Sequence, residues 1–396
     1  MENEYIEKIF DTNLININQD LQYNSLKSIF FEIQQAYKDY GRLNIEKNNT
    51  KTPLQTVLND IRQHSGDYLP LPVVESIETN YSEMIHVVEA DLSPLINNKC
   101  NIKITFFKMR NNNISESTLE IYTKAILTWL VVAKKYETDK CLNYLNIDIY
   151  LTKQIKLLNS KVGEMYDANG GGKHKQLGSN NVNTALTYRC VNGNSTILLY
   201  RSEDLIKTFF HETFHTMNFD FANEAKQESK HIFNVKSPLR LFEAYCETWG
   251  RIINVMYNVI LLEPDMNWKT FNRNFRVLLS IESIYSVIQC CKILNYMNLT
   301  YNDVIANTVY EKFKESSNVF SYYVITAIIM MQPDLFLTYC KENGINLLKF
   351  NESKLAVFIQ LLSKMRMNPN IQAVEKKYNE FGYKNRLKMA IFDIKN

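Results

Sequence analysis

Two histidines, His211 and His215, stand four residues apart in a chain that contains only six histidines. On a helix, residues at this spacing project from one face, one turn above the other. Their imidazole nitrogens can then bind a single Zn²⁺ ion at about 2.0–2.1 Å. Glu212 follows the first histidine, where its carboxylate can reach a water on the metal rather than the metal itself. The spacing therefore predicts zinc as the cofactor and Glu212 as the general base of metal-assisted peptide hydrolysis.

A catalytic zinc ion takes three protein ligands and keeps a fourth position for water. Glu243 is the expected third ligand, and Glu247 lies one turn later on a predicted helix over residues 237–260. Ser237 is a favoured N-cap residue of this helix, and Pro238 falls at its first helical position. Two carboxylates on an otherwise apolar helix face are costly unless a positive group lies opposite. The alternative is a solvated face that carries two ordinary glutamates.

The two histidines are predicted to lie on a helix over residues 202–219. Ser202 can act as its N-cap, and Glu203 and Asp204 place negative charge in the first turn, where the helix dipole favours it. Apolar residues recur at helical spacing, and they are Ile206, Phe210, Phe214 and Met217. A helix this apolar is buried, so its polar residues need partners. A chance occurrence of the motif is the alternative, and the predicted third ligand argues against it.

Strands are expected upstream of this helix. Residues 101–109 and 145–152 have strand patterns and flank a long apolar helix over residues 115–136, which makes a β-α-β passage. Residues 182–190 and 195–201 are predicted to form a hairpin around an Asn-Gly-Asn turn. The first strand of this hairpin either receives an extended substrate on an open edge or is an ordinary part of the sheet.

Residues 180–255 resemble the gluzincin, or thermolysin-like, zinc metallopeptidases. The likeness rests on the His-Glu-x-x-His motif and on a following helix with the sequence Glu243-Ala-Tyr-Cys-Glu247-Thr-Trp-Gly250. The family has Glu-x-x-x-Asp there, with a glycine three residues further on. The resemblance implies that Glu243 binds zinc. It also implies that Glu247, in place of the family's aspartate, accepts a hydrogen bond from a zinc-binding histidine.

The same resemblance extends to a possible substrate-binding strand. The stretch Asn183-Thr184-Ala185 is similar to the edge strand on which the family binds its peptides, which implies a substrate-binding role for these three residues. The segments NVNTALTYRC, ILLYR, HETFH and DF also look like uncharacterised zinc-peptidase-like proteins of large DNA viruses. This second likeness implies a viral origin.

Other metal-binding patterns fit the chain less well. Asp220 misses by one residue the position of the aspartate ligand in related zinc families, and it is the next choice after Glu243. A cysteine ligand at Cys190 would need flanking residues that differ from those present, and Cys246 fits core packing better. Catalysis also needs a donor for the oxyanion. The candidates for that role are Tyr188, His174, His231 and the many C-terminal tyrosines.

Composition narrows the class of protein. The chain has 396 residues, of which 45% are hydrophobic and 22% charged, as in folded soluble proteins. A net charge of +3 without a sustained basic run argues against nucleic-acid binding. Seven cysteines without CxxC pairs predict a reduced, intracellular protein. The start lacks a signal-peptide core, and the apolar stretches 125–133 and 324–331 are too short to cross a bilayer. The expected location is the cytoplasm, and the viral likeness adds the virion.

The expected fold is α+β and bilobed, as in zincins, with a small mixed sheet behind the metal-binding helix. Residues 1–95 are expected to form a mainly helical region of unknown role, residues 96–220 an α/β lobe, and residues 221–396 a helical lobe that supplies Glu243. The expected partner is a peptide or protein substrate in the cleft between the lobes, with no nucleic acid or membrane, and the oligomeric state is open. The alternative function is a non-catalytic structural or docking protein that keeps the fold and its zinc site.

Overall fold

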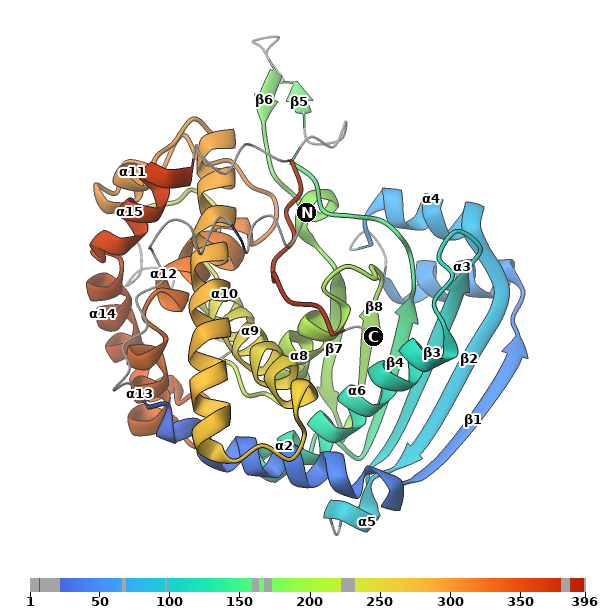
Figure 1. The fold of residues 1–396 in the computed structure, drawn as a ribbon. Coiled ribbons are helices and arrows are strands. Elements are labelled where there is room, and N and C mark those ends of the chain that lie inside the picture. Colours follow the sequence, from blue (N-terminus) through green and yellow to red (C-terminus); the bar gives the residue numbers. More distant parts are fainter. Residues whose placement is uncertain are drawn as a thin grey trace.

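The structure is a computed structural model (Figure 1). It describes Glu7 and residues 22–65, 69–96, 98–158, 164–166, 173–221, 232–378 and 385–394. The fold is mixed α+β and is built on a six-stranded sheet with the order β1-β2-β3-β4-β8-β7. A separate two-stranded ribbon pairs β5 (Glu164–Tyr166) with β6 (Lys173–Lys175).

The main sheet is mixed, as the sequence predicts. Its strands are β1 (Asn44–Lys51), β2 (Tyr81–Asp91), β3 (Asn101–Met109), β4 (Tyr144–Tyr150), β7 (Ala185–Val191) and β8 (Asn194–Leu199). The central strands β3, β4 and β8 pair in parallel, and the other pairs are antiparallel. Since β7 is the last strand in the order, its outer side is an open edge of the sheet.

The β-α-β passage and the hairpin are confirmed. The helix α6 (Glu116–Tyr136) connects β3 to β4, and the hydroxyl of Ser115 caps it by accepting the Thr118 N–H. The hairpin of β7 and β8 turns at Asn192 and Gly193, which have φ values of 52° and 82°. Two consecutive residues with positive φ are the signature of the tight turns that fit the twist of a hairpin.

The first 95 residues contain two strands that the sequence prediction missed. Helices α2 (Lys27–Asp39), α3 (Leu54–Ser65) and α4 (Leu71–Asn80) make up much of this region, with η1 (Asn24–Leu26) and η2 (Tyr40–Arg42). However, β1 and β2 belong to the main sheet, and β2 pairs with β3 across the expected boundary at residue 95. The region is therefore continuous with the α/β part of the chain rather than separate from it.

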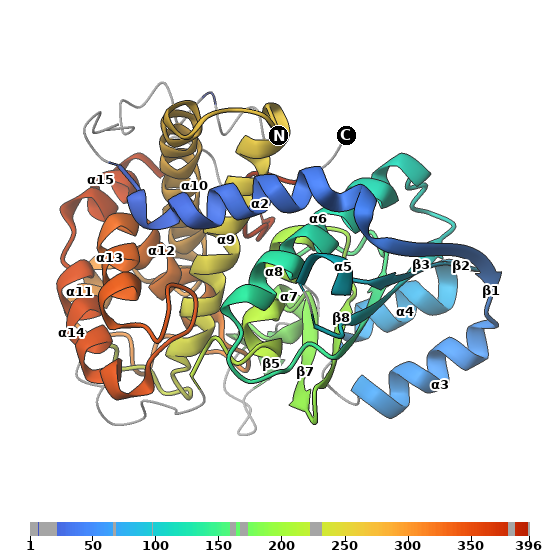
Figure 2. The ribbon, with the colours of Figure 1, turned by 90° about the horizontal axis from the view of Figure 1, so that it is seen from below.

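Helices cover both faces of the sheet (Figure 2). On one face α3 and α4 enclose a small apolar cluster with the strands, formed by Val57, Leu58, Ile61, Leu69, Val73, Ile77, Tyr81, Phe107, Met109, Tyr150, Leu198 and Tyr200. On the other face lie α2, α6 and α8 (Leu205–Thr216), with the short α5 (Ser93–Ile96) and α7 (Ser179–Val182) nearby. That face shares one continuous apolar core with the helices that follow.

The C-terminal part is helical, as predicted. Its elements are α9 (Leu241–Leu262), α10 (Trp268–Tyr296), α11 (Tyr301–Ile305), the π-helix η4 (Phe320–Ile325), α12 (Thr326–Met330), α13 (Pro333–Asn343), η5 (Glu352–Lys354), α14 (Leu355–Met365) and α15 (Pro369–Tyr378). These helices lie beside the sheet, with α8 and α9 between the two parts (Figure 1). Residues 385–394 then return toward α8 as a largely buried segment.

Within the described part of the chain, α10 is long and apolar enough to cross a membrane by length and composition. Its most apolar window is 83% buried inside the protein, however, as in the core helix of a soluble protein. The helices Phe320–Met330 and Pro333–Asn343 pass the same test only as a pair bent by 96°. The apolar stretch around residues 324–331 thus belongs to the core, where Val324 and Ile325 are fully buried.

Candidate metal centre

The helix that carries the histidines starts later than the sequence predicts. Its first residue is Leu205, and the preceding Asp204 has a left-handed backbone with φ 57°, so Ser202 is not its N-cap. Asp204 is also fully buried rather than solvated. Its carboxylate pairs with Lys156 at 2.5 Å and accepts the Met389 N–H at 2.8 Å. These contacts fix the start of α8 against the C-terminal segment.

The second helix of the site also starts later. It begins at Leu241, so Ser237 and Pro238 precede it, and the Ser237 hydroxyl donates to Glu315 instead of capping the helix. Gly250 lies where α9 crosses α8, because a Cβ built there would be 3.2 Å from both the Cβ and the backbone nitrogen of His211. A side chain here would be crowded against α8, so the glycine favours the close approach that brings Glu243 opposite the histidines.

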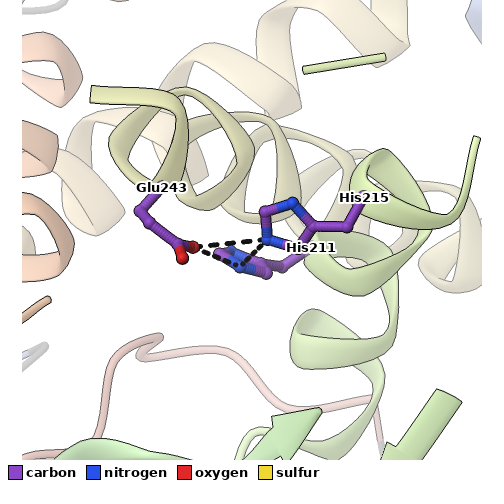
Figure 3. A group of neighbouring side chains, drawn as sticks. All are labelled: His211, His215 and Glu243. Carbon is purple, nitrogen blue, oxygen red and sulfur yellow. Dashed lines mark hydrogen bonds and ion pairs between the residues drawn. The ribbon is translucent and has the colours of Figure 1, made fainter. Parts of the chain in front are cut away.

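Three predicted residues converge on one point (Figure 3). Glu243 Oε2 lies 3.4 Å from His211 Nε2 and 3.3 Å from His215 Nε2, and the two Nε2 atoms are 3.1 Å apart. All three residues are buried, and the spacing of their donor atoms could hold a metal ion. Glu243 Oε1 accepts a hydrogen bond from Asn318 at 3.0 Å. Its Oε2 has no hydrogen-bond partner among the described residues, which is costly for a buried carboxylate oxygen unless a cation binds there.

Each histidine has a second carboxylate behind it. Glu247 Oε2 lies 3.2 Å from His211 Nδ1, within ion-pair distance but off the line of a good hydrogen bond. Asp220 Oδ2 lies 2.7 Å from His215 Nδ1. Carboxylates in this position fix the tautomer and ring orientation of metal-binding histidines. The structure thus places Glu247 beside His211 without the expected hydrogen bond from that histidine. It also places Asp220 against His215, a position that the sequence analysis missed.

Both orienting carboxylates are neutralised by cations. Glu247 receives Lys207 Nζ at 3.0 and 2.9 Å and Arg251 Nε at 2.9 Å. Asp220 receives both terminal nitrogens of Arg189, at 3.0 and 2.5 Å. A second possible metal group, formed by His215, Asp220 and Cys246, shares His215 with the first. Its Asp220 is already engaged by Arg189, so we favour the group that contains Glu243.

The pKa values of His211, His215 and Glu243 show how these buried side chains affect one another's charge. Burial alone would lower the pKa of His211, but Glu243 and Glu247 outweigh it and raise that pKa. Burial likewise opposes charge on His215, while Cys246, Asp220 and Glu243 raise its pKa well above the ordinary value. Burial would raise the pKa of Glu243, but the two histidines hold it far below its usual range. The Glu243 carboxylate is therefore ionised, and the carboxylates around the two imidazoles favour their protonated, positively charged forms.

Glu212 lies beside this group without joining it. Its Oε1 is 4.0 Å from His211 Nε2, and its Oε2 accepts a hydrogen bond from the Thr187 hydroxyl at 2.6 Å. Thr187 belongs to β7, so the open edge strand holds the carboxylate in place. This arrangement matches a proton acceptor next to a metal ion rather than a ligand of that ion.

A pocket opens next to Glu212. It is lined by Val182, Asn183, Thr184, Ala185, Lys207, Thr208, His211, Glu212, Glu247, Tyr322 and Met389. The three residues expected to bind substrate therefore share a pocket with the histidine helix. Part of their backbone is already engaged, since the Asn183 carbonyl accepts from Arg201 and the Thr184 carbonyl from the Tyr200 N–H. Ala185 is the first residue of the edge strand proper.

Among the candidate oxyanion donors, Tyr322 lines the pocket together with His211 and Glu212. Its ring centroid lies 5.9 Å from that of His211, and burial together with Glu243 raises its pKa well above the usual value, so it stays protonated. Tyr188 is two-fifths exposed and, one residue from Thr187, faces the other side of the sheet. The side chain of His174 and the whole of His231 lie outside the described residues.

The expectation that all cysteines are reduced is wrong for one pair. Cys141 and Cys190 form a disulfide, with their Cα atoms 5.3 Å apart, and it ties β7 to the segment before β4. Sequence could not reveal it, because the two residues are 49 positions apart and share no spacing motif. Cys246 is buried and free, with its sulfur 3.8 Å from His215 Nδ1.

Comparison with known proteins adds one relative. The chain is 24% identical over 194 residues to an uncharacterised protein of Acanthamoeba polyphaga mimivirus. The match covers 48% of this chain and 48% of that protein, so it spans about half the length of each. No family model and no solved structure matches the chain. The viral source of this uncharacterised relative agrees with the viral part of the second likeness and says nothing of a zinc peptidase.

Proposed function

We propose that this chain is a zinc-dependent metallopeptidase with a zincin-like, bilobed arrangement around α8 and α9. The observation that carries the proposal is Glu243 Oε2, a buried carboxylate oxygen that has no hydrogen-bond partner in the described part of the chain. It lies between two imidazole nitrogens, with Glu212 alongside. Two histidines and one carboxylate are a donor set that catalytic zinc favours, with a fourth position left for water. The residues present therefore fit the ion.

The roles of the side chains follow from their contacts. His211, His215 and Glu243 would hold the zinc, which supplies an acidified water and polarises the carbonyl of the scissile bond. Glu212 would act as the general base beside this site, taking a proton from the attacking water and giving it to the leaving amine. The Thr187 hydroxyl keeps the carboxylate of Glu212 oriented for this transfer.

Tyr322 is the proposed donor to the oxyanion. It lines the same pocket as His211 and Glu212, and its raised pKa keeps the phenol protonated. A protonated phenol can donate a hydrogen bond where negative charge develops in the transition state. Its position on a π-helix, an irregular element often found at functional sites, agrees with this role.

The substrate is an extended peptide that pairs with β7. Because the Tyr200 N–H bonds the Thr184 carbonyl, the antiparallel alternation turns the backbone N–H and C=O groups of Leu186 and Tyr188 toward β8. The backbone groups of Ala185 and Thr187 point to the open side, where the Ala185 carbonyl already accepts from the Tyr200 hydroxyl at 3.3 Å. Backbone groups on an open edge can receive a peptide as an added strand. The scissile bond would then lie next to Glu212, which Thr187 contacts.

The proposed setting is the cytoplasm or the virion, with no nucleic-acid or membrane partner. The burial of α10 and the viral relative support this setting. The second candidate function, a structural or docking protein that keeps the metal site, makes a different prediction in the following test.

The test compares wild-type protein with Glu212→Gln and His211→Ala. Wild-type protein should bind one zinc ion and cleave peptides from a random library. Glu212→Gln should keep the zinc but lose several orders of magnitude in hydrolysis, because the general base is gone. His211→Ala should lose both. Zinc binding by the wild type without cleavage of any peptide would refute the peptidase and favour the docking function.

A further inference from the structure

Arg189 stands out among the charged residues near the metal centre because it belongs to the edge strand and not to either metal-site helix. Its guanidinium forms two hydrogen bonds with the Asp220 carboxylate, at 3.0 and 2.5 Å. Asp220 in turn lies 2.7 Å from His215 Nδ1. A continuous chain of contacts therefore runs from β7 through Asp220 to a metal-binding imidazole.

Asp220 depends on this cation. Its side chain is completely buried, whereas Arg189 is 40% exposed and reaches inward from the surface. Without the two hydrogen bonds from Arg189, no contact among the described residues fixes both oxygens of the buried carboxylate, and a shifted Asp220 would release its hold on His215. The planar guanidinium fixes both carboxylate oxygens at once, which a single ammonium group cannot do.

The backbone around Arg189 combines a register shift in β7 with a disulfide at the next residue. Pairing between β7 and β8 is regular from Ala185 to Tyr188 and then shifts register before Val191, so the ladder skips Arg189 and Cys190. The disulfide from Cys190 to Cys141 anchors the chain at this irregular point. The same disulfide touches the other partner of the pair, because Asn218, two residues before Asp220, donates to Cys141 Sγ at 3.5 Å.

We propose that Arg189 is a positioning residue for His215, and that the Cys141–Cys190 disulfide holds Arg189 and the turn at Asp220 in register with each other. Zinc affinity is then set partly by the edge strand of the sheet. This inference rests on the proposed zinc site, but it does not depend on peptidase activity. Its readout is metal affinity.

The experiment measures zinc affinity by competition with a chromophoric chelator, on full-length protein. Arg189→Ala should weaken zinc binding about tenfold, as expected when the orientation of a ligand histidine is lost. Arg189→Lys keeps the charge but not the two-pronged contact, so it should fall between Arg189→Ala and the wild type. Tyr188→Ala, on the same strand but the other face of the sheet, is the matched control and should bind zinc as the wild type does.

A double-mutant cycle tests the role of the disulfide. Replacing both Cys141 and Cys190 with serine should weaken zinc binding severalfold in the wild type, but should change nothing further in Arg189→Ala. A purely structural disulfide would give equal losses in both backgrounds, which would overturn its coupling to Arg189.

The outcomes separate this inference from the proposed zinc site. Wild-type affinity in Arg189→Ala, or in Arg189→Lys if the alanine variant does not fold, would overturn the role of Arg189. A wild-type protein without any zinc affinity would instead refute the metal site itself.

Discussion

Glu243 and Glu247 lie one turn apart on α9, and the structure predicts that their neutral variants fail in opposite ways. Glu247 accepts from Lys207 and Arg251 and faces His211 Nδ1, so Glu247→Gln weakens three charge-assisted contacts. At about 1 kcal/mol for each contact, metal-free protein should lose about 3 kcal/mol of its free energy of unfolding. Only one of the three contacts goes to a metal-binding residue, so zinc affinity should fall only about tenfold.

Glu243→Gln should show the reverse pattern. Among the described residues Glu243 accepts one hydrogen bond, from Asn318, and its Oε2 accepts none. Urea unfolding should therefore be measured at an alkaline pH, where both imidazoles are neutral and do not form ion pairs with Glu243. Under that condition the metal-free variant should lose only about 1 kcal/mol. Zinc binding loses a ligand and its negative charge, so affinity should fall by more than about 100-fold, beyond the range for orienting residues.

Two measurements on the same proteins decide between these expectations. Urea unfolding in the presence of a chelator gives the stability of metal-free protein, and chelator competition gives the zinc affinity. Glu263→Gln, at the exposed end of α9, is the matched control and should change neither quantity. If one variant is the more damaging in both measurements, the division of roles between Glu243 and Glu247 is wrong.

Three further predictions concern the surroundings of the site. Thr187→Val removes the hydrogen bond to Glu212, so the rate of peptide cleavage should fall about tenfold while zinc titration shows unchanged affinity. Gly250→Ala places a methyl group 3.2 Å from the His211 backbone nitrogen, so urea unfolding should show a loss of about 1–3 kcal/mol, and zinc affinity should fall as α9 moves away. Zinc binds only neutral imidazoles, and the neighbouring carboxylates raise the pKa of His211 and of His215 above 6.5. Protons therefore compete with zinc, so the zinc affinity should fall steeply when the pH is lowered from about 8 to about 6.

The local part of the site was predictable from sequence because helix geometry fixes it. Residues four apart on a helix share a face, so His211 and His215 were certain to lie together once α8 was helical. Glu243 needed the resemblance to a known family as well, since no local rule says which later helix faces α8. The helices begin two and three residues later than N-caps at Ser202 and Ser237 predict, because both serine hydroxyls bond tertiary partners instead.

The missed residues come from contacts that sequence patterns do not encode. Asp220 reaches His215 because the chain leaves α8 through Asn218, which adopts a left-handed backbone with φ 52°. Tyr322 was one of the many C-terminal tyrosines named as candidates, and sequence alone could not choose it because it lies on a π-helix with irregular spacing. The strand β1 has the sequence NIEKNNTK and is almost wholly exposed, so it lacks the apolar alternation that identifies strands.

The distribution of cations explains which carboxylate is left for the metal. Glu247 forms ion pairs with Lys207 and Arg251, and Asp220 forms one with Arg189. Both carboxylates are therefore neutralised by cations that belong to the protein itself. Glu243 forms no ion pair with a lysine or arginine among the described residues, and the two imidazoles beside it are positive only when protonated. A buried site that neutralises two carboxylates permanently and leaves a third beside two histidines is short of positive charge whenever those histidines are neutral. A divalent cation at that point would supply the missing charge.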